Sequence, residues 1–314
     1  MTIAKALFLY FSLSFLLMAC DGKEESVFQT FSDIYEPSGV VQLADGRVLI
    51  IEDEKKHPFS LLKLNKDNSF TRLPLSKNIQ TKKGIKKIKL DDLEGITLGS
   101  NNWVYAITSH SKNSSGKQKK SREKLVRFRV ADGQLVDYQG LASLRNLLAK
   151  TLPKESMSHL NIEGLAYDFN AQALLLGFRR PRQQGNAIVV QLKNINEAFE
   201  KNDVNKFSAS AISLDLYGKT IRSLEYDPVL QAYLLVSGSK KSRDGNFKLW
   251  LWNDEKIQPV SINNLNGIAY TEGVTSIKTA TGEAALLLVS DDGQRGKSGG
   301  HYAIIPYNHL QINP

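Results

Sequence analysis

A short motif occurs five times along this chain, each time just before several segments of strand-forming residues. The motif is Glu-Gly-aliphatic in "LEGIT", "IEGLA" and "TEGVT", and it is degenerate in "PSGVV" and "IRSLE". The marker positions, 50 to 69 residues apart, are Gly39, Gly95, Gly164, Ser223 and Gly273. Self-similarity at this period restricts the chain to a repeat architecture.

Each marker is followed by short segments rich in Val, Ile, Leu and Tyr, with Asp, Gly, Asn or Lys between them. Four such segments per repeat predict the blade of an all-β fold, a β-propeller. Five four-stranded blades are favoured, and six are the alternative if one blade has lost its marker. The last repeat has only three segments, so the stretch "VFQTFSD" (Val27 to Asp33) is expected to supply its fourth strand and close the ring.

The longest gap between markers contains "GLASLRNLLAKTL", whose leucines recur at helical intervals. It predicts one helix inserted between the second and third blades, and "INEAFEKND" predicts a further short helical turn. Segments such as "VLII", "ALLLGF" and "AALLLV" are apolar on both faces, as expected for sheets packed between neighbours. With no linker in sight, residues 27–314 are predicted to form a single domain.

The N-terminus indicates export. Lys5 precedes the apolar stretch "ALFLYFSLSFLLMA", which is too short for an ordinary membrane-spanning anchor. It ends in "LMAC", which resembles the lipobox of bacterial lipoproteins. The resemblance implies a signal peptide over residues 1–19, a lipid on Cys20, a tether over 20–26 and a place on the periplasmic side of the envelope. If the host has two membranes, Asp21 favours the inner one. A plain secretory signal is the alternative.

Cys20 is the only cysteine, so the exported domain has no disulfide and depends on the core that its length can bury. The formal net charge is +9, and the excess is concentrated in two runs. "KNIQTKKGIKKIK" carries six lysines, and "KNSSGKQKKSREKLVRFR" carries eight basic residues with one Glu. These runs are consistent with solvated loops, or with segments that bind phosphate or an anionic membrane surface. Nucleic acid is excluded as a partner, because no aromatic residues alternate with the lysines to stack bases.

The repeat also predicts a site. In a propeller the first strand of each blade lines the central channel, so the residues before the markers converge at one mouth. These residues are Ser38, Glu94, Glu163, Arg222 and Glu272. The glycine after each Glu is explained by a close backbone approach or a bulge, but a carboxylate near a closed channel needs a partner. Polar clusters that end the second strands, among them His110, Arg179, Asp291 and Asp292, are expected to form an outer ring at the same mouth.

Taken in order, "SGV", "LEGI", "NIEGL" and "TEGV", with "TSHS", "GFRRP", "LWLW" and "VSDDG", resemble an uncharacterised bacterial family of unknown function. That family is distantly similar to the esterase-like domain named from certain phytases. A looser likeness is to gluconolactonase-type propellers, which open blades with Glu-Gly and bind a divalent metal through such a Glu. The second likeness implies a metal at Glu94, Glu163 and Glu272.

Three neighbouring carboxylates need a counter-charge, and two are available. The first is a hard cation such as calcium, with Asn161 and Asp291 completing its oxygen shell. The second is the pair Arg179 and Arg222. A calcium-supported hydrolase of phosphate esters, carboxylic esters or lactones requires the first. A non-catalytic binding or scaffold lipoprotein for an anionic ligand or protein partner fits the second, and a merely structural ring is the third reading. No nucleophile elbow, Walker loop or cysteine pair adds another chemistry.

Overall fold

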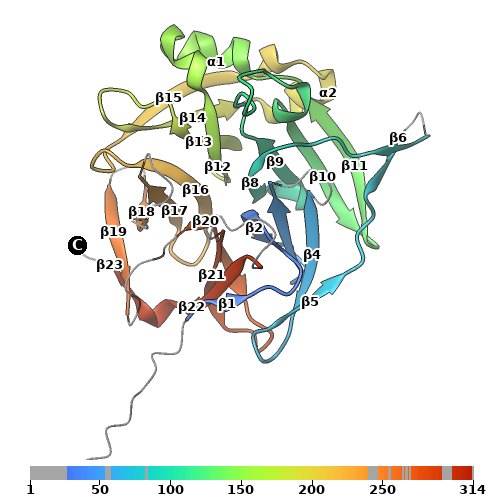
Figure 1. The fold of residues 1–314 in the computed structure, drawn as a ribbon, viewed down its shortest axis with the longest axis vertical. Helices are drawn as coiled ribbons and strands as arrows, with labels where there is room; N and C mark the ends of the chain where they lie inside the picture. Colours follow the sequence, from blue (N-terminus) through green and yellow to red (C-terminus); the bar gives the residue numbers. More distant parts are fainter. Residues whose placement is uncertain are drawn as a thin grey trace, which may run out of the picture.

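The chain forms a ring of five β-sheets, a five-bladed β-propeller, which confirms the predicted fold (Figure 1). The computed structural model describes residues 27–53, 58–81, 84–239, 247–253, 256–263, 265, 268, 270–291 and 299–312. The predicted signal peptide and tether, residues 1–26 with Cys20, lie outside the described residues, as does Asp292.

Each blade runs from an inner strand beside the axis to an outer strand. Blade 1 comprises β2 (Pro37–Gln42), β3 (Val48–Glu52), β4 (Phe59–Leu64) and β5 (Phe70–Leu73). Blade 2 comprises β8 (Leu93–Leu98), β9 (Val104–Thr108), β10 (Leu125–Ala131) and β11 (Gln134–Leu141). Blade 3 comprises β12 (Asn161–Asp168), β13 (Ala173–Arg180), β14 (Ala187–Lys193) and β15 (Ser208–Leu214). Blade 4 comprises β16 (Thr220–Asp227), β17 (Ala232–Gly238), β18 (Lys248–Trp252) and β19 (Ile257–Ile262).

Blade 5 joins the two ends of the chain. Its strands β20 (Thr271–Lys278), β21 (Ala284–Ser290) and β22 (His301–Pro306) are completed by β1 (Gln29–Thr30), in which Gln29 pairs with Tyr302. The predicted closure is therefore confirmed, although only two residues form the ladder. Packing adds to it, because Phe31 is buried and its ring lies 4.6 Å from that of Tyr302 and 5.7 Å from that of Phe70 in blade 1.

Two additions lie outside the expected blades. The first lysine-rich run is not a loop but a hairpin, β6 (Asn78–Thr81) and β7 (Gly84–Lys87), which extends blade 2 to six strands. Ile79 in β6 and Ile88 just after β7 are buried in the core and hold the base of the hairpin to blade 2, whereas Ile85 in β7 is exposed. The short strand β23 (Leu310–Ile312) adds a fifth strand to blade 4.

The inserted helix is present but shorter than its leucine pattern suggested. It is α1 (Arg145–Thr151), because Leu141 belongs to β11, where it pairs with Leu125. The second predicted turn is α2 (Ile195–Lys201). Five 3-10 turns complete the elements: η1 (Ser100–Asn102), η2 (Lys120–Arg122), η3 (Lys154–His159), η4 (Val204–Lys206) and η5 (Tyr307–His309).

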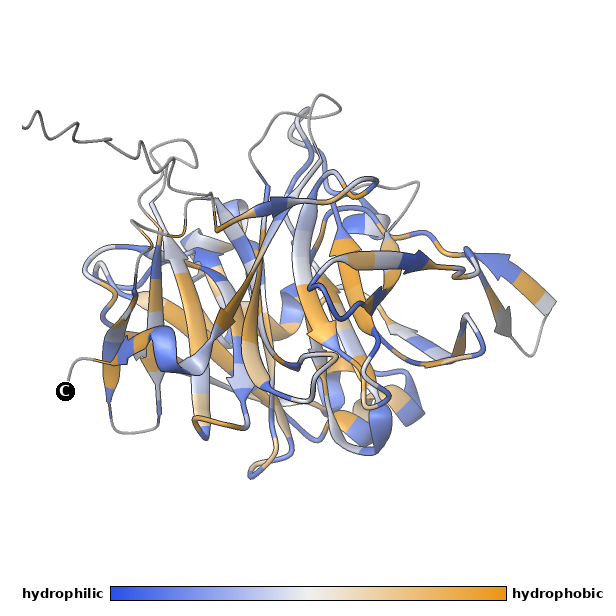
Figure 2. Ribbon diagram, turned by 90° about the horizontal axis from the view of Figure 1, so that it is seen from below, coloured by the Kyte–Doolittle hydropathy of each residue, from blue (hydrophilic) through white to orange (hydrophobic). Residues whose placement is uncertain are grey.

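The core lies between the blades. Strands such as β3, β9 and β17 are buried at every position, as the doubly apolar segments predicted. Five hydrophobic clusters fill the spaces between neighbouring sheets, and Figure 2 shows hydrophobic residues along the strands with hydrophilic ones in the loops. Within the described residues, no helix has the length and apolar character needed to cross a membrane.

Ring closure makes a testable prediction. Replacing Phe31 by Ala removes a buried ring that packs on both terminal blades, so we expect a loss of about 3–5 kcal/mol in the free energy of unfolding. Urea denaturation measures this loss. The control is Val27→Ala, at a side chain 39% exposed just before the same strand, which should change stability little. If Phe31→Ala melts like the parent, the N-terminal strand is a tether and not a closing element.

Candidate functional site

A β-bulge lies at the entry of the inner strand in all five blades. The pairing jumps from Leu93–Thr108 to Gly95–Ile107 in blade 2, so Glu94 is the extra residue. The same jump omits Ser38, Glu163, Arg222 and Glu272 in the other blades. A bulge redirects a side chain and bends its strand. Each residue that precedes a marker, and that was predicted to face the channel, is therefore the bulged residue of its blade.

The glycines after the bulges allow the blades to approach one another closely. A Cβ on Gly95 would lie 2.7 Å from the Cβ of Leu165 in the next blade, and one on Gly164 would lie 2.8 Å from the Cβ of Leu224. Gly273 approaches blade 1 in the same way, since its Cβ would lie 3.0 Å from the Cα of Gly39. Both explanations given for the glycine, close approach and a bulge, hold together at this position.

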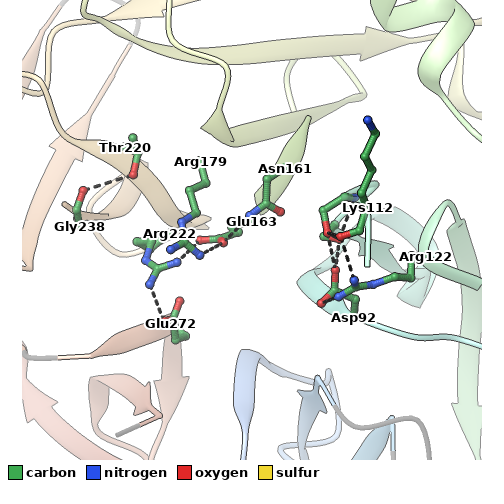
Figure 3. A network of polar contacts seen from close by, with 12 residues as sticks. Asp92, Lys112, Arg122, Asn161, Glu163, Arg179, Thr220, Arg222, Gly238 and Glu272 are labelled. Atoms are coloured by element: carbon green, nitrogen blue, oxygen red, sulfur yellow. Dashed lines mark hydrogen bonds and ion pairs between the residues drawn. The ribbon is translucent and has the colours of Figure 1, made fainter. Parts of the chain in front are cut away.

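The bulged residues of blades 3, 4 and 5, which precede the markers, form one network of ion pairs (Figure 3). The buried Glu163 receives Arg222 Nη1 on Oε2 at 2.6 Å and Arg179 Nη1 on Oε1 at 2.8 Å. Asn161 Nδ2 donates to the same Oε1 at 2.9 Å. Arg222 continues to blade 5, where its Nη2 lies 2.9 Å from Oε1 of Glu272.

The protein environment keeps Arg222 charged. Burial disfavours its guanidinium charge, but the carboxylates of Glu163 and Glu272 outweigh that effect and raise the pKa of Arg222. Among the described residues, removing Arg222 would leave the buried Glu163 with Arg179 as its one cation. Arg222 therefore binds blades 3, 4 and 5 together at the mouth.

Glu94 differs from its two counterparts. Its half-buried carboxylate makes no hydrogen bond or ion pair with any described residue. Burial raises its pKa well above the usual value, and the charges of Glu163, Asp92, Asp53 and Glu272 raise it further. Burial likewise raises the pKa of Glu272 to about 8, against the attraction of Arg222. Three mouth carboxylates thus meet two guanidinium groups, and both burial and the neighbouring carboxylates favour the protonated form of Glu94.

The arrangement of Glu163 and Glu272 does not fit a calcium ion. Both oxygens of Glu163, and Oε1 of Glu272, already accept hydrogen bonds from arginine, and Asn161 offers its amide nitrogen to this network. A hard cation would have to displace these guanidinium groups. Among the described residues, no group of three or more His, Cys, Asp or Glu side chains is arranged to hold a metal.

A second polar cluster, which the sequence analysis did not assign, lies in blade 2 beside the mouth (Figure 3). The buried Asp92 accepts Ser111 Oγ at 3.0 Å, is also bonded by Ser109 Oγ, and forms an ion pair with Arg122. It holds the β9–β10 loop to the strand entry. The sequence signal that could have identified Asp92 is its place two residues before Glu94. In the structure its φ is 64°, a conformation that favours Asp or Asn among residues other than glycine.

His110 does not lie in the mouth, and its predicted binding role is corrected. The ring is fully buried, with Nδ1 2.9 Å from the carbonyl of Thr108 and Nε2 accepting from the Leu144 amide at 3.3 Å. Burial lowers its pKa to about 4, so the ring is neutral. It supports the start of α1, because a neutral imidazole donates through one nitrogen and accepts through the other.

The outer ring is only partly assembled as predicted. Arg179 is the residue that reaches Glu163, as described above. Ser237 is fully buried and accepts the indole Nε1 of Trp250 at 2.7 Å, so it belongs to the interior of blade 4. Asp291 is half-buried at the end of β21, and its backbone amide donates to Tyr270 O at 3.1 Å.

Two adjoining basic pockets open beside the mouth, with volumes of about 330 and 420 Å³. They share His159, Arg179 and Arg180. The first is completed by Ser111, Lys112, Ser158, Leu160 and Asn161. The second is completed by Ser156, Pro181, Arg182, Gly185 and Thr220. None of the described residues that line either pocket is acidic, so the pockets are positively charged.

Three polar groups of the first pocket, two cations and one acceptor, have no partner within the described part of the chain. Lys112 and Arg180 make no ion pair there, although both line the pocket. The buried Oδ1 of Asn161 has no hydrogen-bond donor, since the amide is oriented with Nδ2 toward Glu163. The pocket therefore offers two cations and one acceptor to an incoming molecule. Sequence analysis grouped Arg179 with Arg180 but missed Lys112, which only folding brings near them.

A family of unknown function, DUF6929, matches residues 37–223, which is more than half of the chain. A second, DUF3616, also described only as of unknown function, matches residues 144–305. This chain belongs to both families. No curated protein matches it.

Solved propellers resemble the chain only distantly. A PQQ-bound aldose sugar dehydrogenase from Streptomyces coelicolor shares 15% identity over 91% of this chain and 98% of its own, with a TM-score of 0.40. The periplasmic gluconolactonase of Pseudomonas aeruginosa shares 11% identity over 85% of this chain and 72% of its own, with a TM-score of 0.38. Likeness at this level says nothing about reaction or ligand.

The unpaired Glu94 predicts how stability depends on pH. A carboxyl whose pKa is raised on folding stabilises the protein below its unfolded pKa, and this stability is lost as pH rises through the folded pKa. We therefore expect Glu94→Gln to raise the Tm by several degrees at pH 8 and to change it little at pH 4. The control is the exposed Glu155→Gln, which should leave both values unchanged. A lower Tm for Glu94→Gln at pH 8 would mean that Glu94 is ionised and holds a cation.

Proposed function

We propose that this protein is an exported, lipid-anchored binding protein that holds a small anionic molecule beside the mouth of its propeller. The basic pocket lined by Lys112, Asn161 and Arg180 carries the proposal. Two uncommitted cations and an unsatisfied acceptor in one concave site, with no acidic residue in its described lining, favour an anion.

The ion-pair network explains why this site suits binding. Arg179 lines both pockets while its Nη1 is held by Glu163, so its orientation is fixed before a ligand arrives. A pre-oriented guanidinium loses little entropy on binding a carboxylate or phosphate. The remaining positive charge of Arg180 and Lys112 then meets the charge of the ligand directly.

The acceptor at Asn161 narrows the ligand class. Its Oδ1 is buried and needs a donor, which a bare phosphate or sulfate does not provide. A small anion that also carries a hydroxyl satisfies both the cations and this oxygen. The serines at 111, 156 and 158 add further hydroxyl partners around the two pockets.

Isothermal titration with glycerol 3-phosphate tests this site, with orthophosphate and uncharged glycerol as comparison ligands. We expect glycerol 3-phosphate to bind most tightly and Arg180→Gln to weaken it roughly 10- to 100-fold, the worth of a hydrogen bond to a charged group. The control is Lys201→Gln on α2, which removes the same charge away from both pockets. Equal binding by Arg180→Gln and the parent would refute the site.

Lipid anchoring is the second part of the proposal, and "LMAC" after a short apolar run supports it. We expect mass spectrometry of the N-terminal peptide to show acyl additions on Cys20. Cys20→Ser should move the protein from the membrane fraction to the soluble fraction. A mature N-terminus without acyl groups would leave only export.

A calcium-supported hydrolase of phosphate esters, carboxylic esters or lactones is the second candidate function, and Glu94 favours it. A carboxyl whose pKa is raised keeps its proton to higher pH, which is the character of a general acid. Calcium distinguishes the two functions. For the binding protein we expect coincident melting curves with millimolar calcium and with chelator, because arginines already neutralise Glu163 and Glu272. A rise equivalent to about 4 kcal/mol, expected for a micromolar site, would instead support the hydrolase.

A further inference from the structure

We infer that the β6–β7 hairpin of blade 2 is a membrane-docking element, which holds the propeller against an anionic phospholipid surface. The hairpin projects from the rim of the ring (Figures 1 and 2). Among the residues that the structure describes, a single parallel bridge, Leu135–Ile79, joins it to β11. Its place at the periphery separates it from the basic pockets at the mouth.

Its charge is uniform. Lys77, Lys86, Lys87 and Lys89 are all exposed, and no acidic residue occurs between Leu75 and Leu90. A basic segment close to an anionic leaflet gains about 1 kcal/mol of binding free energy per lysine. Lys86 and Lys87 lie in β7, and Lys77 and Lys89 flank the hairpin at its base. Together these four side chains are enough for reversible docking beside a lipid anchor.

A further basic segment adjoins the hairpin. The amide of Asp91 donates to the carbonyl of Ser121 at 3.0 Å, which ties the segment between β7 and β8 to the β9–β10 loop. Lys117, Lys119 and Lys120 in this loop are exposed as well. The two lysine-rich runs recognised in the sequence therefore adjoin on blade 2.

Two apolar features favour lipid over other anionic partners. Ile85, between the lysines, is 72% exposed, and a basic segment with an exposed aliphatic side chain is typical of membrane interfaces. At the base of the hairpin lies a pocket of about 400 Å³, with apolar walls from Phe59, Leu73 and Ile88 and with Lys77 and Arg72 in its lining. Arg72 is already paired with Asp33, so Lys77 is the cation that this lining offers to a headgroup. Apolar walls beside a lysine suit an acyl chain and its anionic headgroup.

The same lysines have a simpler explanation, which the experiment must separate. β7 is the outermost strand of its sheet, and lysines on edge strands prevent aggregation. That role requires no anionic surface and gains nothing from an exposed isoleucine. It also predicts that losing the lysines promotes self-association without changing any interaction with vesicles.

The test is co-sedimentation of the mature chain carrying Cys20→Ser, so that no lipid anchors it. Vesicles of phosphatidylcholine with and without roughly one-third phosphatidylglycerol are compared. We expect binding to the anionic vesicles alone, weakened by salt. Lys86→Gln with Lys87→Gln should weaken it roughly 30-fold, the equivalent of about 2 kcal/mol. Ile85→Ser should weaken it as well.

The matched control is Lys201→Gln with Lys256→Gln, which removes the same two charges from exposed positions near blades 3 and 4 and should bind like the parent. Equal loss in the control would show that net charge alone, and not the hairpin, is responsible. No binding by the parent, or unchanged vesicle binding with new self-association in the hairpin variant, would overturn the inference. Glycerol 3-phosphate titration of the same variants keeps this result separate from the pocket.

Discussion

The structure depends on how closely five strands can approach one axis. Gly95 and Gly164 have no room for a Cβ, since the backbone and side chains of the next blade lie within about 3 Å of where it would be. The bulge directly before each of them releases one residue from the ladder. Crowding at the axis therefore fixes the glycine and at the same time turns the preceding side chain into the mouth.

Charge balance at the mouth follows from this geometry. Bulges that turn three glutamates toward one axis create a repulsion that each blade alone would not have. Arg222, which occupies the Glu place in blade 4, and Arg179, from the second strand of blade 3, provide two of the three positive charges. The remaining carboxyl, Glu94, has no arginine partner among the described residues, and its raised pKa makes the stability of the fold depend on pH.

The sequence predicted the features that recur in every blade and missed the contacts that occur in one blade alone. The five markers gave the blade count, the closing strand and the mouth residues, because each of these follows from one periodic constraint. His110 was misplaced, since nothing in "SHS" reveals that Leu144 would approach its ring from a helix 34 residues later. Lys112 was not singled out for the same reason. The β6–β7 hairpin was taken for a loop, because six lysines dominate the run and only two of its residues, Ile79 and Ile88, reach the core.

The bulge forms whatever side chain it turns outward, so the requirements of folding and of function fall on different residues. The glycine, or Ser223 in blade 4, meets the packing requirement, and the bulged residue before it is Ser, Glu or Arg in different blades of this one chain. Substitutions at the bulged position alter the charge of the mouth while the inter-blade contact of the following residue stays the same. The fold therefore constrains where a site forms much more strongly than what the site binds, and the ligand must be inferred from the side chains around it: here Arg180, Lys112 and the free acceptor of Asn161.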